Sequence, residues 1–305
     1  MSEKSHSKIN RYTVAVAMST FNDTHRAVLA VKSIFESNTR AYVKAVVVDD
    51  GSEQDTVDAL AALAEEYEHL TFIPRPHRER GFARHEAIQE ALNLKPDFML
   101  FMDADMILET GAIQYCIQSI EDTKAGAVVV REVPFSDCSN FATKVKVFER
   151  HILNNSQMEM TEDSIEAARF WTTQAWEESG GLNPSQIAFE EIQPTIRYMK
   201  KGGKIARCRR AKMHHDEKEV TFDNLFGKKA YYFGQMHKTA NSEENGVKEM
   251  IKRWYPFRKV YYEEQNVREY IKHPILAAGM VGMYAGLTGI AVKNLGVNLI
   301  KNRGK

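Results

Sequence analysis

Two groups of carboxylates in this sequence stand directly behind apolar runs. Asp103-Ala104-Asp105 follows the run Phe98–Met102, and Asp49-Asp50 follows the run Tyr42–Val48. Side chains at positions i and i+2 of an extended chain point the same way, so the two aspartates of the first group can share one site. Carboxylate oxygens suit Mg²⁺ and Mn²⁺, which usually bind a few carboxylates together with substrate phosphates. The pattern therefore predicts a divalent cation, Mn²⁺ or Mg²⁺, that holds a diphosphate.

Three other interpretations of these carboxylates are open. As solvated acids of loops they would have no chemical role. A phosphohydrolase would use Asp103 as a phosphoryl nucleophile, but the motif follows three earlier predicted strands, and the turn Asp49–Ser52 has no part in that scheme. The third interpretation is a binding protein that has the same fold but no catalytic activity. The intact carboxylates at both strand ends disfavour this interpretation.

The elements that position these carboxylates alternate between strands and helices. Short apolar runs predict buried strands, and apolar residues at helical spacing predict helices. Such alternation is typical of a parallel sheet with helices on both faces, an α/β fold whose ligands bind outside the carboxyl ends of the strands. The predicted strands are Thr13–Ser19, Tyr42–Val48, Leu70–Ile73, Phe98–Met102, Ala127–Val133 and Lys204–Arg207. The predicted helices are Asp23–Ser37, Asp55–Tyr67, Gly81–Leu92, Thr110–Ile120, Phe141–Asn154, Glu190–Lys201, 220–234, 247–272 and 274–292.

Six short motifs follow one another along the chain: Val16–Asn22, Val47–Ser52, Gly81–Ala87, Leu100–Asp105, Gly180–Leu182 with Phe189–Glu191, and His214-His215. Together they resemble the family 2 glycosyltransferases, which are inverting enzymes of the GT-A fold. The resemblance covers residues 13–215. It implies a Rossmann-like, mostly parallel sheet flanked by helices. The chain departs from the family pattern at His85, where Asn is usual, and at Glu191, where Asp is usual.

The resemblance implies a nucleotide-sugar site at the edge of the sheet. Asp50 would accept hydrogen bonds from the nucleobase, Arg84 would contact the base or the phosphates, and Asp103 would face the ribose and the metal. Asp105 would bind the metal, with His214 as a further ligand and His215 as the alternate, unless both histidines are surface residues of a basic segment. The other residues implied for nucleotide-sugar binding are Ser19, Thr20, Phe21, Asn22, Gly81 and Ala104.

Glu191 is the candidate for the general base. An inverting transfer needs a carboxylate that takes the proton of the acceptor hydroxyl on the face opposite the leaving group. Glu190 is the fallback, and either residue could instead stabilise the start of the predicted helix Glu190–Lys201. If the acceptor were a lipid phosphate, which is already ionised, no base would be needed.

Aromatic residues suggest where the acceptor and the membrane lie. Trp171 and Trp176 fall in the segment that approaches the acceptor in this family, although core packing is equally compatible with their sequence context. The segments Tyr231–Phe233 and Trp254–Lys259 mix aromatic with basic side chains, a combination that favours the headgroup zone of a membrane. We interpret these two segments as a membrane-facing platform, with plain helix packing as the alternative.

The segment Pro274–Val292 carries no charge and is nearly long enough to cross a bilayer core. Its four glycines would permit close helix packing in a membrane. Basic residues flank both ends, which favours a helix that lies at or dips into an anionic surface, and a buried soluble hairpin is the alternative. We therefore divide the chain into a GT-A catalytic domain (1–219), a basic and aromatic helical segment (220–272) and an apolar, membrane-associated helical tail (273–305).

The composition is that of an ordinary globular protein, with 43% hydrophobic and 27% charged residues and a net charge of zero. The charge is unevenly distributed, since ten Lys and Arg face three Glu from Ile251 to the end. A basic C-terminal third suits phosphates or anionic lipid. Cys116, Cys138 and Cys208 fit neither a disulfide framework nor a zinc cluster, and residues 1–12 lack an apolar signal core. These features predict the cytoplasmic face of a membrane.

Together these observations predict a metal-dependent inverting glycosyltransferase. It would move a sugar, a hexose by expectation, from a nucleoside diphosphate donor, with uridine favoured. The acceptor would be a lipid-linked or membrane-proximal glycan, as in polysaccharide or glycolipid synthesis. No nucleic-acid partner is expected.

Overall fold

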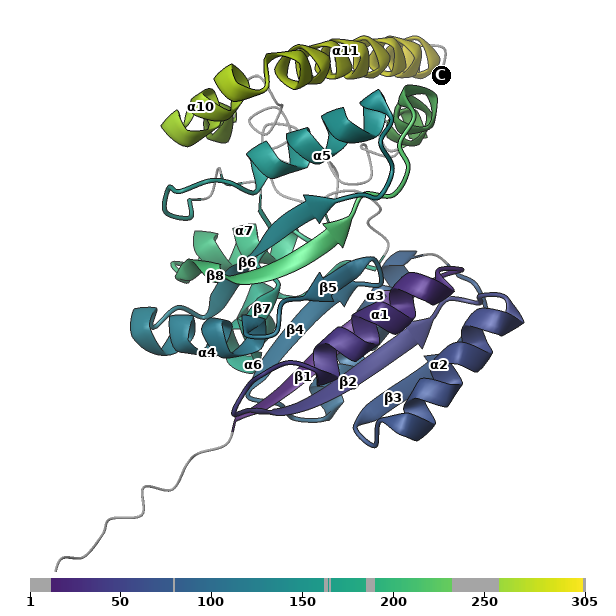
Figure 1. Ribbon diagram of the computed structural model, residues 1–305, viewed down its shortest axis with the longest axis vertical. Coiled ribbons are helices and arrows are strands. Elements are labelled where there is room, and N and C mark those ends of the chain that lie inside the picture. Colours follow the sequence, from purple (N-terminus) through teal and green to yellow (C-terminus); the bar gives the residue numbers. More distant parts are fainter. Residues whose placement is uncertain are drawn as a thin grey trace, which may run out of the picture.

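The computed structural model describes residues 12–78, 80–161, 164, 166–184, 190–231 and 258–303. An eight-stranded sheet of order β3-β2-β1-β4-β7-β6-β8-β5 forms its centre, flanked by helices (Figure 1). The strands are β1 (Thr13–Thr20), β2 (Tyr42–Asp49), β3 (Leu70–Pro74), β4 (Phe98–Asp103), β5 (Met106–Leu108), β6 (Ala127–Phe135), β7 (Phe170–Thr172) and β8 (Ile205–Asp216). The helices whose two ends are described are α1 (Thr24–Phe35), α2 (Gln54–Glu66), α3 (Arg80–Asn93), α4 (Ala112–Thr123), α5 (Phe141–Leu153), α6 (Thr173–Ser179), α7 (Gln193–Lys200), η2 (Lys259–Tyr262), α10 (Glu264–Lys272) and α11 (Pro274–Arg303). Residues 222–231 are helical as well.

The first half of the sheet confirms the predicted parallel arrangement. β1 pairs in parallel with β2 and with β4, and β2 pairs in parallel with β3. Alternate residues of β1 enter different cores: Val14 and Val16 pack with residues of α1, α2 and α4, whereas Ala15 and Ala17 pack with residues of α3, α6 and α7. Because both faces are covered, these strands are continuous apolar runs in the sequence.

The second half of the sheet is mixed and contains elements that the sequence did not predict. β7 lies antiparallel between β4 and β6, and β5 lies antiparallel to β8. Each is only three residues long, too short to show a periodic pattern. The predicted end of β8 at Arg207 is wrong, because pairing with β6 resumes beyond an irregularity in register, with Lys212 opposite Arg131. The charged residues around that irregularity disguise the strand in the sequence.

The C-terminal helices pack on α5 rather than on the sheet. Val145 and Phe148 of α5 share a third core with Met280, Met283 and Leu287 of α11, and α11 lies along α5 (Figure 1). This core joins residues from all three predicted parts of the chain, and their division into domains stays a prediction. Of the predicted membrane platform, Tyr231 is half exposed; residues 232–233 and 254–257 lie outside the described residues.

Candidate functional site

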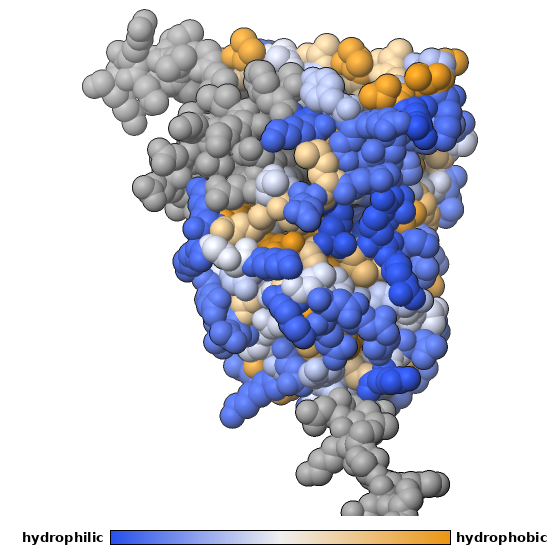
Figure 2. All heavy atoms as spheres, turned by 90° about the vertical axis from the view of Figure 1, so that its left-hand side faces the viewer, coloured by the Kyte–Doolittle hydropathy of each residue, from blue (hydrophilic) through white to orange (hydrophobic). Residues whose placement is uncertain are grey.

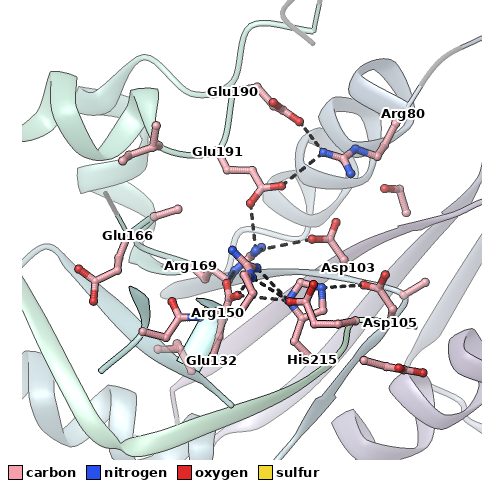
Figure 3. A pocket seen from close by; sticks show the side chains of 18 of the residues that line it. Arg80, Asp103, Asp105, Glu132, Arg150, Glu166, Arg169, Glu190, Glu191 and His215 are labelled. Carbon is pink, nitrogen blue, oxygen red and sulfur yellow. Dashed lines mark hydrogen bonds and ion pairs between the residues drawn. The ribbon is translucent and has the colours of Figure 1, made fainter. Parts of the chain in front are cut away.

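A pocket of about 830 Å³ opens at the carboxyl ends of β1, β2 and β4 and continues along β6, β8 and α5. Figure 3 shows side chains that line it, among them Asp103, Asp105 and His215. This is the edge at which ligands of open α/β sheets bind. Of the residues that the sequence suggested for a nucleotide sugar, those that line it are Ser19, Thr20, Phe21, Asp50, Asp103 and Ala104. Asn22, Gly81 and Arg84 are not among its lining residues.

The turn after β2 separates a structural aspartate from one that lines the pocket. Asp49 is fully buried, and its carboxylate accepts hydrogen bonds from the backbone N–H groups of Gly51 (3.1 Å) and Ser52 (2.9 Å). Gly51 has a φ of +79°, and a Cβ there would lie 2.5 Å from the backbone nitrogen of His77. The turn therefore requires glycine and directs Asp50 into the pocket.

An aromatic pair lies beside Asp50. The Phe21 ring is 48% exposed, and its centroid is 4.6 Å from that of the His77 ring. The His77 Nδ1 atom lies 3.1 Å from the Asp50 carboxylate. Sequence reasoning missed His77, which stands alone in a loop. Asn22 does not line the pocket but holds the turn after β2, since its side-chain oxygen accepts the N–H of Glu53 at 2.8 Å.

Buried arginines hold Asp103 in place. Its carboxylate forms an ion pair with Arg84 and lies 3.6 Å from Arg169. Burial alone would raise the pKa of Asp103, but the charges of Arg84, Arg169 and Arg80 outweigh burial and hold it well below the usual range. Asp103 is therefore ionised. Arg84 fixes its carboxylate from behind the pocket.

Among the described residues, Asp105 is the carboxylate with a buried oxygen that the protein leaves unsatisfied. Its Oδ1 atom is buried without a hydrogen-bond partner, 3.6 Å from Nε2 of His215. Burial and the neighbouring charge of Asp103 raise the pKa of Asp105. His215 in turn lies with Nδ1 3.2 Å from Glu132; burial would lower the pKa of its ring, but that hydrogen bond and the charge of Glu132 raise it.

This donor set fits a divalent cation. An unsatisfied carboxylate oxygen beside an imidazole suits Mn²⁺ or Mg²⁺, and the carboxylate behind the imidazole is the usual second partner of a metal-bound histidine. No three His, Cys, Asp or Glu side chains within the described ranges form a ready cage for a metal ion. Phosphate oxygens of a substrate would have to complete the coordination.

Of the two histidines considered as metal ligands, the alternate residue His215 lines the pocket, whereas the first choice, His214, does not. Neighbouring side chains of a strand point to opposite faces. The His214 side chain is 41% exposed and lies 3.6 Å from Glu109, away from the pocket. Sequence alone could not choose between two adjacent histidines.

Glu190 and Glu191 line the pocket in ion pairs with arginines. Glu191 lies 2.6 Å from Arg84 and 2.9 Å from Arg169, and Glu190 lies 2.9 Å from Arg80. Burial would raise the pKa of Glu191, but the charges of Arg84 and Arg169 lower it. Neither residue caps a helix, because α7 begins after Ile192 and has no side-chain cap.

Trp171 and Trp176 are core residues, so their prediction as acceptor contacts is wrong. They are 0% and 2% exposed, and their rings meet edge to face with centroids 5.5 Å apart. The Trp171 indole donates to the carbonyl of Ala168 at 2.8 Å. The alternative, packing in the core, is correct.

Sequence reasoning also missed the charged network along β6, β8 and α5. Arg169 lies 2.9 Å from Glu132, and Glu132 lies 2.8 Å from Arg150. Arg207 lies 2.6 Å from Glu166. These residues stand far apart in the sequence without a motif. One available signal was Arg169 between Ala168 and Phe170, because an arginine within an apolar segment must find buried partners.

The chain is similar to known proteins in both sequence and structure. The profile of Glycosyl transferase family 2 matches residues 15–175. The mannosyltransferase PcManGT from Pyrobaculum calidifontis, solved in complex with GDP-Man and Mn²⁺, is similar with a TM-score of 0.59 and 16% identity, over 94% of this chain and 88% of that chain. Residues 1–349 of S. aureus TarS, in complex with UDP, are similar with a TM-score of 0.50 and 13% identity, over 83% and 73%. No curated protein matches the sequence.

Proposed function

Because the chain belongs to Glycosyl transferase family 2 and has the GT-A fold, it is a glycosyltransferase, and we propose that it moves a hexose, with inversion, from a nucleoside diphosphate donor to a lipid-linked or membrane-proximal glycan acceptor. The observation that carries this proposal is the pocket at the sheet edge, where Asp50, Asp103 and Asp105 lie together. Asp103 is ion-paired to two arginines, an arrangement that disfavours its use as a phosphoryl nucleophile.

The donor would lie across the ends of β1, β2 and β4. The exposed Phe21 ring offers a face for the base, and Asp50 beside it offers carboxylate oxygens as acceptors. We retain uridine as the favoured base. One of the two similar structures is a complex with GDP-Man and the other is a complex with UDP. The test therefore includes both guanosine and uridine diphosphate sugars.

Mn²⁺ or Mg²⁺ would be held by Asp105 and His215, with Asp103 beside them. When bound, the ion offsets the negative charge that grows on the departing diphosphate. Neighbouring side chains set the charge of Asp103 and the orientation of the His215 ring. Arg84 and Arg169 keep Asp103 ionised, and Glu132 lies where it can accept the Nδ1–H proton of His215, which leaves Nε2 toward Asp105.

A membrane location is supported by α11. Pro274–Lys293 is long and apolar enough to cross a membrane, by length and composition. Ile275, Val281 and Val292 are each more than half exposed, and apolar residues gather over this end of the molecule (Figure 2). We propose that this helix associates with the cytoplasmic face of a membrane, where a lipid-linked acceptor would reach the pocket.

For a hydroxyl acceptor we propose Glu191 as the general base and Glu190 as its fallback, since both line the pocket. The ion pairs of Glu191 stabilise its ionised form and so weaken it as a base.

A thermal-shift screen tests the proposal. The full chain is heated with a set of uridine and guanosine diphosphate sugars, with and without Mn²⁺, because a ligand that binds only the folded state raises the melting temperature. We expect at least one nucleotide sugar to raise it, and Mn²⁺ to enlarge the shift. If no nucleotide sugar changes the melting temperature with or without Mn²⁺, the proposal is refuted.

A further inference from the structure

The side of the pocket formed by β6, β8 and α5 contains buried N–H donors without partners. Within the described part of the chain, these are Nη1 of Arg169, Nη1 of Arg207 and Nδ2 of Asn154, and all three residues line the pocket. The Arg169 and Arg207 side chains are only 3% and 10% exposed. A buried donor that is left unsatisfied costs about 1–3 kcal/mol. A ligand rich in acceptor oxygens would satisfy all three donors.

The charge of this side also favours an anion. Its carboxylates are already engaged, since Glu166 pairs with Arg207, and Glu132 and Glu217 pair with Arg150. Further cations line the same side: Lys146, which pairs with Glu149 at 2.7 Å, and Arg209, Lys228 and Lys229. Burial, and next the charge of Lys146, lower the pKa of Lys229 to about 8. Such crowding of positive charge is relieved when an anion enters.

The ion pairs of the two candidate general bases also favour an anionic acceptor. Glu190 and Glu191 are ion-paired to Arg80, Arg84 and Arg169, so the pocket holds no uncommitted carboxylate at the place predicted for a base. A phosphate monoester loses its second proton near pH 6 and is already a nucleophile at neutral pH. An acceptor of this class would need no proton removed.

We propose that the side lined by Asn154, Arg169 and Arg207 binds a phosphate monoester, and that an oxygen of this phosphate is the nucleophile that receives the sugar. This substrate class rests on the proposed transfer from a nucleotide sugar, and it replaces the glycan with a phosphate monoester as the acceptor. The phosphate oxygen forms a bond to the anomeric carbon, the bond from that carbon to the nucleoside diphosphate breaks, and its electron pair leaves with the diphosphate. The product is a sugar phosphodiester, and no proton changes place.

A lipid phosphate is the favoured source because of α5. Lys146 and Arg150 of this helix line the pocket, while Val145 and Phe148 of the same helix pack in the core that α11 completes. The phosphate site therefore lies under the apolar helix that exposes Ile275 and Val281. A soluble phosphate ester has the same headgroup chemistry and serves as the second arm of the test.

The full chain is incubated with Mn²⁺, the donor found by the thermal-shift screen and one acceptor at a time. The acceptors are decyl phosphate, glycerol 3-phosphate, decanoate and decanol, and products are identified by mass spectrometry. We expect a sugar phosphodiester from decyl phosphate and none from decanol or decanoate. Equal rates with glycerol 3-phosphate would support the phosphate site and exclude the lipid source. Products from decanol or decanoate but from neither phosphate would overturn the proposal.

Arg207→Gln should raise KM for decyl phosphate about 10-fold to 100-fold, the factor expected for one charge-assisted hydrogen bond, and leave the dissociation constant of the donor unchanged. Because Glu166 loses its partner in this variant, Arg207→Gln with Glu166→Gln is measured beside it. Arg210→Gln is the matched control, since Arg210 is on the same strand, lies over the Tyr115 ring and does not line the pocket. An equal loss of donor binding in Arg207→Gln would assign this side to the donor and overturn the proposal.

Calorimetry with decyl phosphate alone distinguishes failure of the phosphate site from failure of the proposed glycosyltransferase function. Binding without donor, weakened in Arg207→Gln and not in Arg210→Gln, would support the phosphate site even if no nucleotide sugar bound. Absence of binding with and without a donor analogue would refute the site while leaving the glycosyltransferase proposal intact.

Discussion

Arg169 is the residue whose removal should most disturb the charged centre of the pocket. Its guanidinium lies 2.9 Å from Glu132, 2.9 Å from Glu191 and 3.6 Å from Asp103, and its side chain is 3% exposed. Removing one partner of a buried ion pair costs about 3–5 kcal/mol, because the remaining charge is left uncompensated. We expect Arg169→Met, which replaces the stem but not the charge, to lower the free energy of unfolding at pH 7 by about that amount.

The pH dependence of this loss follows from the carboxylates. In the native chain Arg169 helps to hold the pKa values of Glu132, Glu191 and Asp103 below their usual range. That contribution is present above the unfolded pKa values, near pH 4, and is lost as pH falls through the folded ones. In Arg169→Met burial raises these pKa values, so the folded variant binds protons as the pH falls. The deficit should therefore be smaller at pH 5 than at pH 7.

Urea unfolding followed by fluorescence at both pH values measures the effect in wild type and variant. Arg210→Met is the matched control: Arg210 is exposed, lies over the Tyr115 ring and has no such carboxylate cluster, so its loss should stay below about 1 kcal/mol. A loss below about 1 kcal/mol for Arg169→Met at pH 7, or a deficit that grows toward pH 5, would refute the assigned network.

Four further predictions concern single side chains. Asp105→Ala should abolish transfer and the Mn²⁺-dependent part of the melting shift; near wild-type activity with Mn²⁺ present would contradict its role. His215→Gln should weaken Mn²⁺ binding, measured by paramagnetic resonance in the presence of nucleotide, by at least about 10-fold, whereas His214→Gln should leave it unchanged; the reverse order would restore the sequence-based choice. Glu191→Gln should lower kcat with decyl phosphate less than about 10-fold, since a true general base contributes about 10²–10⁴-fold; a larger fall that follows pH like a single carboxylate would argue for the base. Trp171→Ala should lower the free energy of unfolding in urea by about 3–5 kcal/mol because the side chain is fully buried, and a neutral effect on stability with a raised acceptor KM would contradict its core position.

Much of the fold was predictable because buried parallel strands leave a strong pattern. The runs at 13–19, 42–48, 70–73 and 98–102 match β1 to β4 within a residue or two. The later half was less predictable. β5 and β7 are too short for periodicity, and β8 carries basic residues where it is irregular. Their places depend on pairing with strands far away in the sequence, which local pattern does not encode.

Some residues of the candidate site were predictable from the sequence and others were not. Carboxylates that end apolar strands were visible in the sequence, because strand ends of a parallel sheet meet at one edge. His77, Arg169 and Glu132 were not, since each comes from a different loop or strand and has no motif around it. The two tryptophans show the limit of residue type: an aromatic ring suits a sugar face and a core equally well until its burial is known.

The sequence by itself determined that this chain forms an α/β sheet with acidic strand ends, because hydrophobic periodicity and turn chemistry act over a few residues. Only the tertiary structure decided that His215 rather than His214 enters the pocket, that Glu191 is tied to Arg84 and Arg169, and that unpaired donors of Asn154 and Arg207 meet on one side. The physical reason is that charge and hydrogen bonding act between side chains in space. Which side chains meet is set by how strands and helices pack, whatever their separation along the chain.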